Sequence, residues 1–259
     1  MKIHLIHAPL DMRRFNRWVG NRGLIRNGSF DAGYALHVLL SAMFGKGVLQ
    51  PFRLFASERR ASAALYAYAE VDEIELRDTA TAVAPPDCLD VIDPDRMRSK
   101  RMPAPFEQGR RLGFDLRLRP VRRLRCDLAD PQLGRSLSRG AEVDAFWLEV
   151  MRRFPSGWAD SAAARAGVTR ESVYAEWLCE RLGDAVAVEE CGLVSVSRSR
   201  AVRSDGRGPE GPDVILHGTF TVANEETFAG FLRNGVGRHR AYGYGMLLLR
   251  PPNKTIPEQ

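Results

Sequence analysis

The sequence lacks the features that mark several large classes of protein. It contains no run of 18 apolar residues, the length that predicts a membrane-spanning helix. Its four cysteines, Cys88, Cys126, Cys179 and Cys191, all lie more than three residues apart. Structural zinc sites use close cysteine pairs, so we expect free thiols and no structural metal. The first ten residues are too short and too polar for a signal peptide, and we expect a cytoplasmic protein.

Lysine is scarce as well. Four of the 38 lysine and arginine residues are lysines, namely Lys2, Lys46, Lys100 and Lys254. The net charge of +6 at pH 7 favours an anionic partner, although a GC-rich genome also produces an arginine excess. Residues 96–125 hold eleven lysines and arginines against only Glu107 and Asp115. Such a concentrated basic stretch is typical of phosphate binding.

Strand and helix patterns alternate through the first half of the chain. Alternating apolar side chains predict strands at 2–10, 51–57, 62–70 and 111–119, and helical spacing predicts helices at 29–45 and 71–80. The order is strand, helix, strand, strand, helix, strand. Between the first strand and the first helix, we interpret residues 10–28 as a long loop that carries Arg13, Arg14, Arg17, Arg22 and Arg26.

The second half shows a similar order with one extra helix. Helices are predicted at 141–154, 169–183 and 224–235, and strands at 185–203, 213–222 and 244–251. Thr169 and Asn224 are suited to begin the second and third helices, and Gly183 and Gly235 to end them.

Taken together, the two halves predict an α+β fold of tandem ferredoxin-like (RRM-like) domains. We expect the domains to span residues 1–122 and 123–259, each with an antiparallel sheet that carries its helices on one face. This prediction rests on the order of elements alone, because the two halves share no detectable sequence repeat.

The stretch GVGRHRAYGYGMLLLRP, residues 235–251, combines glycines with basic residues. A dinucleotide-binding fingerprint would follow a strand and begin a helix, whereas this stretch follows a helix and precedes a strand. A helix C-cap explains Gly235 alone. Closely spaced glycines let a backbone approach a ligand, and neighbouring arginines favour phosphate. The stretch therefore predicts a contact with a phosphate backbone by Gly235, Gly237, Arg238, His239, Arg240, Gly243 and Gly245.

Tyr34 and His37 lie about one turn apart on the helix predicted at 29–45. They fall together near the edge of its apolar stripe, so the helix can present both to one site. In an arbitrary protein, the more frequent interpretation is a tyrosine and a histidine at the boundary of a core.

Four segments together resemble one known family. They are the Y-x-x-H within GYALHVLLSAMFG, the strand RLGFDLRLRP, the helix VYAEWL and the terminal GVGRHRAYGYGMLLLRP. In this combination and order, the chain resembles the CasE type of CRISPR repeat endoribonuclease, the processing subunit of type I-E systems. The resemblance implies two ferredoxin-like domains that bind the stem-loop of the repeat RNA and cut at the 3′ base of the stem without a metal. It also implies assembly with other subunits of the effector complex, and no cofactor.

The same resemblance implies roles for particular residues. Tyr34 and His37 would form the active site, and Gly235–Gly245 the glycine-rich loop. The implied RNA-binding side chains outside that loop are Arg198, Arg200, Arg203 and Arg207 of a basic hairpin. We also expect Arg122 and Arg123, which lie in the basic stretch 96–125, to bind RNA. Segment 10–28 is longer than the usual connection of the family, and either adds RNA contacts or is an insertion with a solvated face. Tyr242 and Tyr244 occupy positions that vary in the family.

The implied reaction is attack of a ribose 2′-OH on the adjacent phosphate, which gives a 2′,3′-cyclic phosphate or 3′-phosphate and a 5′-OH. His37 would act as general base or as general acid, because a histidine titrates near neutral pH. Tyr34 would position the 2′-OH or the phosphate, or donate to the oxyanion. Two alternatives remain: a non-catalytic RNA-binding subunit with the same fold, and a nucleotide-binding enzyme that uses the glycine loop.

Overall fold

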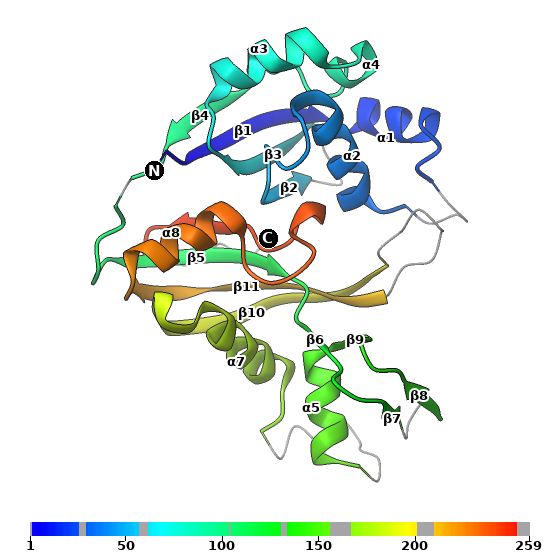
Figure 1. Ribbon diagram of the computed structural model, residues 1–259, viewed down its shortest axis with the longest axis vertical. Coiled ribbons are helices and arrows are strands. Elements are labelled where there is room, and N and C mark those ends of the chain that lie inside the picture. Colours follow the sequence, from blue (N-terminus) through cyan, green and yellow to red (C-terminus); the bar gives the residue numbers. More distant parts are fainter. Residues whose placement is uncertain are drawn as a thin grey trace.

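The computed structural model describes residues 2–25, 30–56, 62–103, 105–130, 134–155, 167–200 and 210–252. Figure 1 shows two sheets with their helices stacked along the long axis, followed by a smaller helical and stranded extension. Within the described ranges, no helix is long and apolar enough to cross a membrane. All four cysteines are free thiols, as the sequence predicts.

The first sheet contains four antiparallel strands in the order β2-β3-β1-β4. Its elements are β1 (His4–Asp11), α1 (Met12–Asn21), α2 (Ala32–Phe44), β2 (Phe52–Ala56), β3 (Ser62–Ala69), α3 (Glu73–Val83), α4 (Pro86–Leu89), the 3-10 turn η1 (Pro94–Arg96) and β4 (Arg98–Arg101). Alternate residues of β1 and β3, such as Ile6 and Leu65, pack against Leu36 and Leu39 of α2. The helices therefore cover one face of this sheet.

The second sheet repeats this topology, with four antiparallel strands in the order β10-β11-β5-β12. Its elements are β5 (Arg111–Leu118), α7 (Arg170–Leu182), the 3-10 turn η2 (Gly183–Ala185), β10 (Val186–Arg200), β11 (Glu210–Val222), α8 (Glu225–Asn234), the 3-10 turn η3 (Arg240–Tyr242) and β12 (Leu247–Arg250). In each sheet, the third strand lies between the first and second, and the fourth lies beside the first. This shared order confirms the predicted tandem ferredoxin-like fold.

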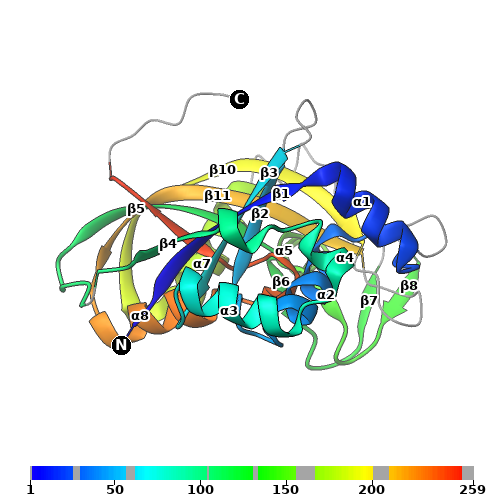
Figure 2. The same ribbon diagram turned by 90° about the horizontal axis from the view of Figure 1, so that it is seen from above.

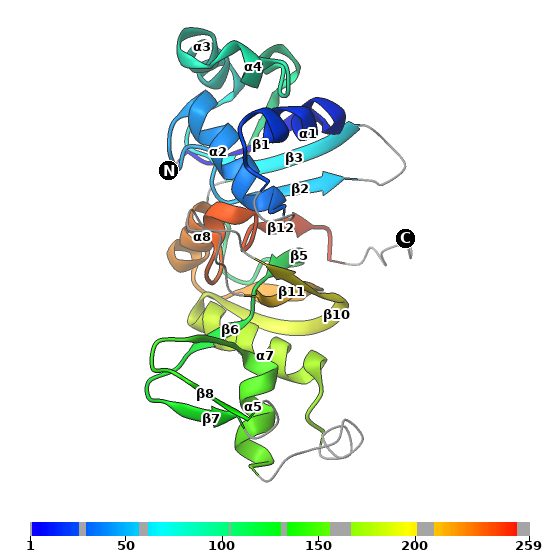
Figure 3. The same ribbon diagram turned by 90° about the vertical axis from the view of Figure 1, so that its right-hand side faces the viewer.

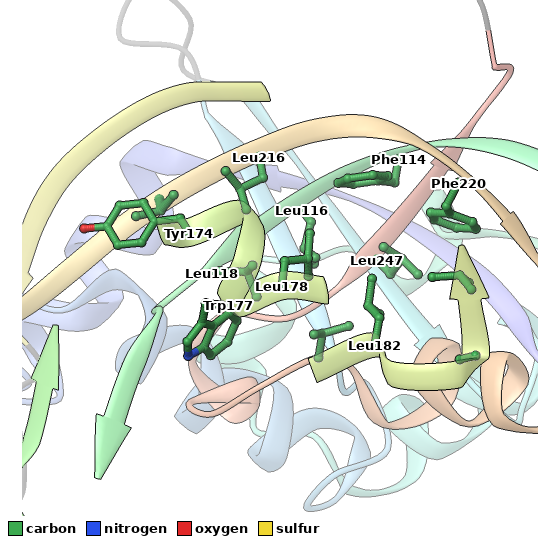
Figure 4. Close-up of a cluster of buried hydrophobic side chains, with 14 of the residues drawn as sticks. Phe114, Leu116, Leu118, Tyr174, Trp177, Leu178, Leu182, Leu216, Phe220 and Leu247 are labelled. Atoms are coloured by element: carbon green, nitrogen blue, oxygen red, sulfur yellow. The ribbon is translucent and has the colours of Figure 1, made fainter. Parts of the chain in front are cut away.

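Helix α7 packs on the core of the second sheet, as Figure 4 shows. Leu116 of β5, Leu216 of β11 and Leu178 of α7 are fully buried there. Trp177, also fully buried, donates from its indole nitrogen to the carbonyl oxygen of Val121 at 3.3 Å. Thr169 begins α7 with a capping box and Gly183 ends it, as predicted.

An extension is inserted between β5 and α7. It contains β6 (Val121–Arg123), β7 (Leu128–Asp130), β8 (Arg135–Leu137), β9 (Glu142–Asp144) and α5 (Ala145–Arg153). β6 pairs with β9, and Leu124, Val143, Leu148 and Met151 form a small core of their own. Figure 3 shows α5, β7 and β8 at the end of the molecule farthest from the first sheet.

Two sequence predictions need correction. The strand at 111–119 was expected to close the first domain, but β5 pairs with β11 and β12 in the second sheet, and β4 closes the first. The sheets therefore divide between β4 and β5, before the expected boundary at 122/123. Alternation shows that a strand is half-buried but does not say which sheet contains it. Residues 10–28 are also no simple loop, since Met12–Asn21 forms α1 with Asp11 as its N-cap.

The two domains meet through buried contacts. Seen from above in Figure 2, the strands of the first sheet cross those of the second. The hydroxyl of Tyr68 in β3 donates to the carbonyl oxygen of Leu247 in β12 at 2.9 Å. The buried carboxylate of Asp115 in β5 also forms an ion pair with Arg53 of β2. These contacts fix the first domain, which carries α2, against the second, which carries the glycine-rich loop.

A buried cluster of charges is centred on Asp115. The guanidinium groups of Arg53 from β2 and Arg250 from β12 both contact its carboxylate, and His217 Nε2 lies 2.8 Å from its Oδ2. Burial by itself would raise the pKa of Asp115, but the contacts with His217, Arg53 and Arg250 hold it below the usual value. Charge pairing thus joins strands from both sheets.

Candidate active site

Helix α2 presents Tyr34 and His37 at the junction of the two domains. It begins at Asp31, whose carboxylate accepts a hydrogen bond from the Tyr34 backbone nitrogen at 3.0 Å, and ends at Gly45. Leu36 and Leu39 are buried on one side of the helix, while Tyr34 and His37 are half-buried. Helical spacing therefore places both polar side chains at the border between the core and the surface.

Tyr242 from the other domain completes this group. It lies in η3, and its ring centroid is 5.5 Å from that of His37 and 6.4 Å from that of Tyr34. No role in the active site was predicted for Tyr242. Its involvement depends on the folding of the loop back onto α2, which no local pattern reveals.

The approach of the loop to α2 requires a glycine in the helix. A Cβ atom at Gly33 would lie 2.3 Å from the carbonyl oxygen of Tyr242, well inside van der Waals contact. Only a residue without a side chain therefore allows the loop backbone to reach the first turn of α2.

The glycines of the loop have structural roles. Gly235, Gly237, Gly243 and Gly245 all have positive φ, between 74° and 82°. An added Cβ would lie 2.9 Å from the Trp177 ring at Gly237, and 2.3 Å from the Val236 carbonyl oxygen at Gly245. Backbone conformation and close internal packing thus account for the four glycines. Their contact with an RNA backbone stays a prediction.

The basic residues of the loop bond to other parts of the protein. Arg238 Nε lies 2.6 Å and His239 Nε2 lies 2.8 Å from the carboxylate of Glu142 in β9, and Arg240 donates to the carbonyl oxygen of Asn234 at 2.7 Å. Burial opposes the charge on Glu142, but its contacts with His239 and Arg238 hold its pKa below the usual value. Glu142 thereby ties the loop to the extension.

A basic cavity of about 350 Å³ opens beside this group. It is lined by Phe30, Asp31, Ala32, Gly33, Arg117, Arg119, Arg198, Ser199, Arg200, His239, Tyr242 and Tyr244. The cavity thus brings together the first turn of α2, the ends of β5 and β10, and the glycine-rich loop. Of the residues expected to bind RNA, Arg198, Arg200 and His239 line it.

Hydrogen bonds fix the side chains of one cavity wall. Arg117 donates from Nε to Asp213 at 2.8 Å and lies over the ring of Tyr244, 4.7 Å from its centroid. The hydroxyl of Tyr244 is 2.8 Å from the Ser199 hydroxyl, and the buried Arg119 donates to the Ser199 carbonyl oxygen at 2.5 Å. Neither Arg117 nor Arg119 was assigned a role from the sequence, although both lie in its basic stretch.

Two further predicted RNA-binding residues lie away from the cavity lining. Arg122 and Arg123 are in β6, where Arg122 pairs with Glu180 at 2.8 Å and Arg123 donates to the carbonyl oxygen of Gly140 at 3.0 Å. Arg203 and Arg207 fall outside the described residues.

The environment of His37 favours its neutral form. Partial burial lowers its pKa below the ordinary 6.5, and the positive charge of Lys46 lowers it further. A neutral imidazole at pH 7 can accept a proton. In the described part of the chain, no three His, Cys, Asp or Glu side chains are grouped as metal ligands would be.

Comparison with known proteins identifies the family. The model of the family described as CRISPR associated protein matches residues 3–251. The chain belongs to this family. Its fold is also that of the CRISPR endoribonuclease Cse3 bound to a 19-nucleotide RNA, with a TM-score of 0.62, 16% identity, and coverage of 97% of this chain and 100% of that one.

Two further solved structures share the fold. Cse3 of Thermus thermophilus, bound to an RNA that represents a pre-cleavage complex, has a TM-score of 0.57 at 17% identity over 97% of this chain and 100% of that one. Cas6e of Escherichia coli K-12 has a TM-score of 0.56 at 16% identity over 96% of this chain and 99% of that one. No curated protein sequence matches. The family and the fold confirm the resemblance seen in the sequence.

Proposed function

We propose that this CRISPR-associated protein is an endoribonuclease that cleaves CRISPR repeat RNA at the 3′ base of its stem-loop. The observation that carries the proposal is the position of His37 and Tyr34 against Tyr242, whose ring also lines the arginine-rich cavity. A titratable imidazole and a phosphate-binding surface then lie side by side. Membership of the family and the fold shared with the endoribonuclease Cse3 support the proposal.

The arginines supply the affinity for RNA. Arg198 and Arg200, at the end of β10, lead into the basic hairpin segment predicted from the sequence and line the cavity. Duplex RNA has a deep, narrow major groove, so arginines there bind the backbone and its shape more than base edges. The stem-loop would lie along this surface, with its base directed at α2.

The cleavage would be an internal transfer at one phosphate. The ribose 2′-oxygen forms a new bond to phosphorus while the bond from phosphorus to the 5′-oxygen of the next nucleotide breaks. The 2′-OH loses its proton and the leaving 5′-oxygen gains one. The products are a 2′,3′-cyclic phosphate, which can open to a 3′-phosphate, and a 5′-OH.

His37 would carry one of these two protons, as base toward the 2′-OH or as acid toward the 5′-oxygen. Its lowered pKa keeps the imidazole unprotonated at neutral pH, which is the form that a general base needs. Tyr34 would position the 2′-OH or the phosphate. Arg117 of the cavity wall would stabilise the charge that develops on the phosphate oxygens. In this scheme, side chains perform every proton transfer, and a metal has no part.

After cleavage, the protein would stay on the stem-loop of its product and assemble with the other subunits of an RNA-guided effector complex. A non-catalytic RNA-binding subunit with the same fold is the alternative, and it would need the arginines but neither Tyr34 nor His37. A nucleotide-binding enzyme would bind free nucleotides with no preference for a stem-loop.

One experiment separates these functions. The repeat stem-loop is incubated with the protein in EDTA, once unmodified and once with a single 2′-deoxy substitution at the nucleotide whose 2′-OH attacks. The proposal predicts cleavage of the first RNA and none of the second. Cleavage of the deoxy substrate, or a requirement for added metal, would rule out the mechanism, and binding without any cleavage would favour the non-catalytic subunit.

A further inference from the structure

The cavity beside Tyr242 combines two chemistries. Arg117, Arg119 and Arg200 give it positive charge, whereas Phe30 and Tyr242 offer aromatic rings. A site for a bare phosphate needs the positive charge but not the aromatic rings. Its volume of about 350 Å³ falls at the low end of pockets that hold an organic ligand, about 300–1,000 Å³. Charge for a phosphate together with rings for a base describes a site for one nucleotide.

The deep wall of this cavity is organised before any ligand arrives. Asp213 holds Arg117 at 2.8 Å, and the Tyr244 hydroxyl contacts both Ser199 and Asp213, at 2.8 and 3.2 Å. Fixed donors bind an anion with little loss of side-chain entropy.

The rim of the cavity, in contrast, is open. Phe30 is 43% exposed, and Arg200 is exposed and has no acidic partner among the described residues. A base can therefore reach the Phe30 ring, and a phosphate can reach Arg200. Unstacked RNA bases bind in this way, by stacking on aromatic or guanidinium planes.

The position of the cavity indicates which nucleotide it takes. Tyr242 separates it from His37, so its occupant is next to the reacting phosphate. A base pair is too large for it, and the occupant must be unpaired. At the 3′ base of a stem, the nucleotide before the cut is paired and the nucleotide after it is unpaired. Turning the unpaired nucleotide out of the stack breaks no base pair, so it costs the least free energy.

We propose that this cavity binds the first nucleotide on the 3′ side of the cleaved bond, with its base on Phe30 and Tyr242 and its 3′-phosphate on Arg200. The proposal rests on the proposed function and adds a second determinant to it. The enzyme would recognise an unpaired nucleotide beyond the stem as well as the stem itself.

Fluorescence of 2-aminopurine tests this placement. The probe is the repeat stem-loop with 2-aminopurine at the first nucleotide after the cut and a 2′-deoxy substitution that prevents cleavage. Saturating protein should quench the label by stacking. A label three nucleotides further downstream in an otherwise identical RNA should keep its fluorescence.

Variants separate stacking from general binding. Phe30→Leu retains an apolar contact with Phe15 but removes the stacking surface, and should abolish most of the quenching and weaken binding of the flanked stem-loop about tenfold. Arg200→Ala should weaken the binding of the flanked stem-loop. Its effect on the affinity for a stem-loop without the 3′ flank should be much smaller. Arg96 is an exposed arginine near α3. Arg96→Ala is the matched control, and it should change neither the quenching nor the affinity for the RNA.

Each outcome decides the inference. Quenching that depends on Phe30 supports it. A label that stays bright while the unmodified RNA is bound and cut, or quenching that survives in Phe30→Leu, overturns the nucleotide site and leaves the proposed function intact. If the stem-loop is neither bound nor cut, both fail.

Discussion

The ring of Tyr242 lies edge-on to the imidazole of His37, with 5.5 Å between centroids and 74° between the ring planes. The two residues come from different domains, and the glycine-rich loop carries Tyr242 across the boundary. The candidate active site therefore exists only while the two ferredoxin-like domains are docked.

Gly33 should not tolerate a side chain. At an exposed position in a helix, Gly→Ala stabilises the folded protein by about 1 kcal/mol through helix propensity. At Gly33 the new Cβ would clash with the Tyr242 carbonyl at 2.3 Å, so we expect Gly33→Ala to destabilise by about 1–3 kcal/mol and to lower cleavage. Gly230→Ala in α8 is the control, because a Cβ there meets nothing within 4 Å, and it should be stabilising. Thermal unfolding and single-turnover cleavage measure both. Equal effects of the two substitutions would contradict the close approach.

Glu142 is expected to act as a positioning residue. It contacts Arg238 and His239 together, and His239 has a left-handed backbone with φ of 61°. Glu142→Gln keeps the shape but weakens both contacts, and should lower single-turnover cleavage by up to about 100-fold through misplacement of Tyr242. Affinity for the stem-loop should change far less. Glu149→Gln, which removes a surface pair with Arg153, should leave cleavage unchanged. A parallel loss of binding in Glu142→Gln would argue for a purely structural role.

The pH dependence of cleavage should report the environment of His37. Since burial and Lys46 lower its pKa, the rate should titrate below pH 6.5, rising with pH if His37 is the base and falling if it is the acid. Lys46→Gln removes a positive charge that opposes protonation, so the inflection should move up in pH while staying below 6.5, because burial remains. Lys100→Gln is the control with no shift. An inflection unaffected by Lys46→Gln would show that another group limits the rate.

The buried charges at the domain junction should matter for stability. Asp115→Asn leaves Arg53 and Arg250 without their common carboxylate, and should cost about 3–5 kcal/mol of unfolding free energy. Because the folded state lowers the pKa of Asp115, its contribution is complete above the pKa of the unfolded chain and is lost as the pH falls through the folded value.

Denaturant unfolding at neutral and acidic pH checks this prediction. Asp95→Asn removes an exposed pair with Arg77 and should have little effect at any pH. If Asp115→Asn is as stable as the parent chain, the cluster does not hold the domains together.

The sequence predicted the fold class because the order of elements and their caps are local signals. Thr169, Gly183, Asn224 and Gly235 begin and end their helices as expected. Helix α1 was missed, although Phe15, Trp18 and Val19 are buried at helical spacing after the N-cap Asp11. The arginines of this segment and the neighbouring glycines are a composition typical of loops. The N-cap and the helical spacing therefore indicate a helix, but the composition of the segment favoured a loop.

The site was predictable only in part. Helical spacing puts Tyr34 and His37 together, because the helix alone determines that relationship. Tyr242 and Glu142 could not be found, since each reaches the site through contacts with residues distant in sequence. The loop glycines were associated with a ligand, whereas packing against Trp177 and Val236 already requires two of them.

The most direct measurement is the effect of His37→Ala on cleavage and on binding of the same stem-loop RNA. We predict that single-turnover cleavage falls by about 10²–10⁴-fold while the Kd stays within about twofold, because His37 transfers a proton and does not hold the RNA. His7→Ala, a half-buried histidine on β1, serves as control and should cleave normally. Cleavage by His37→Ala at the rate of the parent chain would contradict the account.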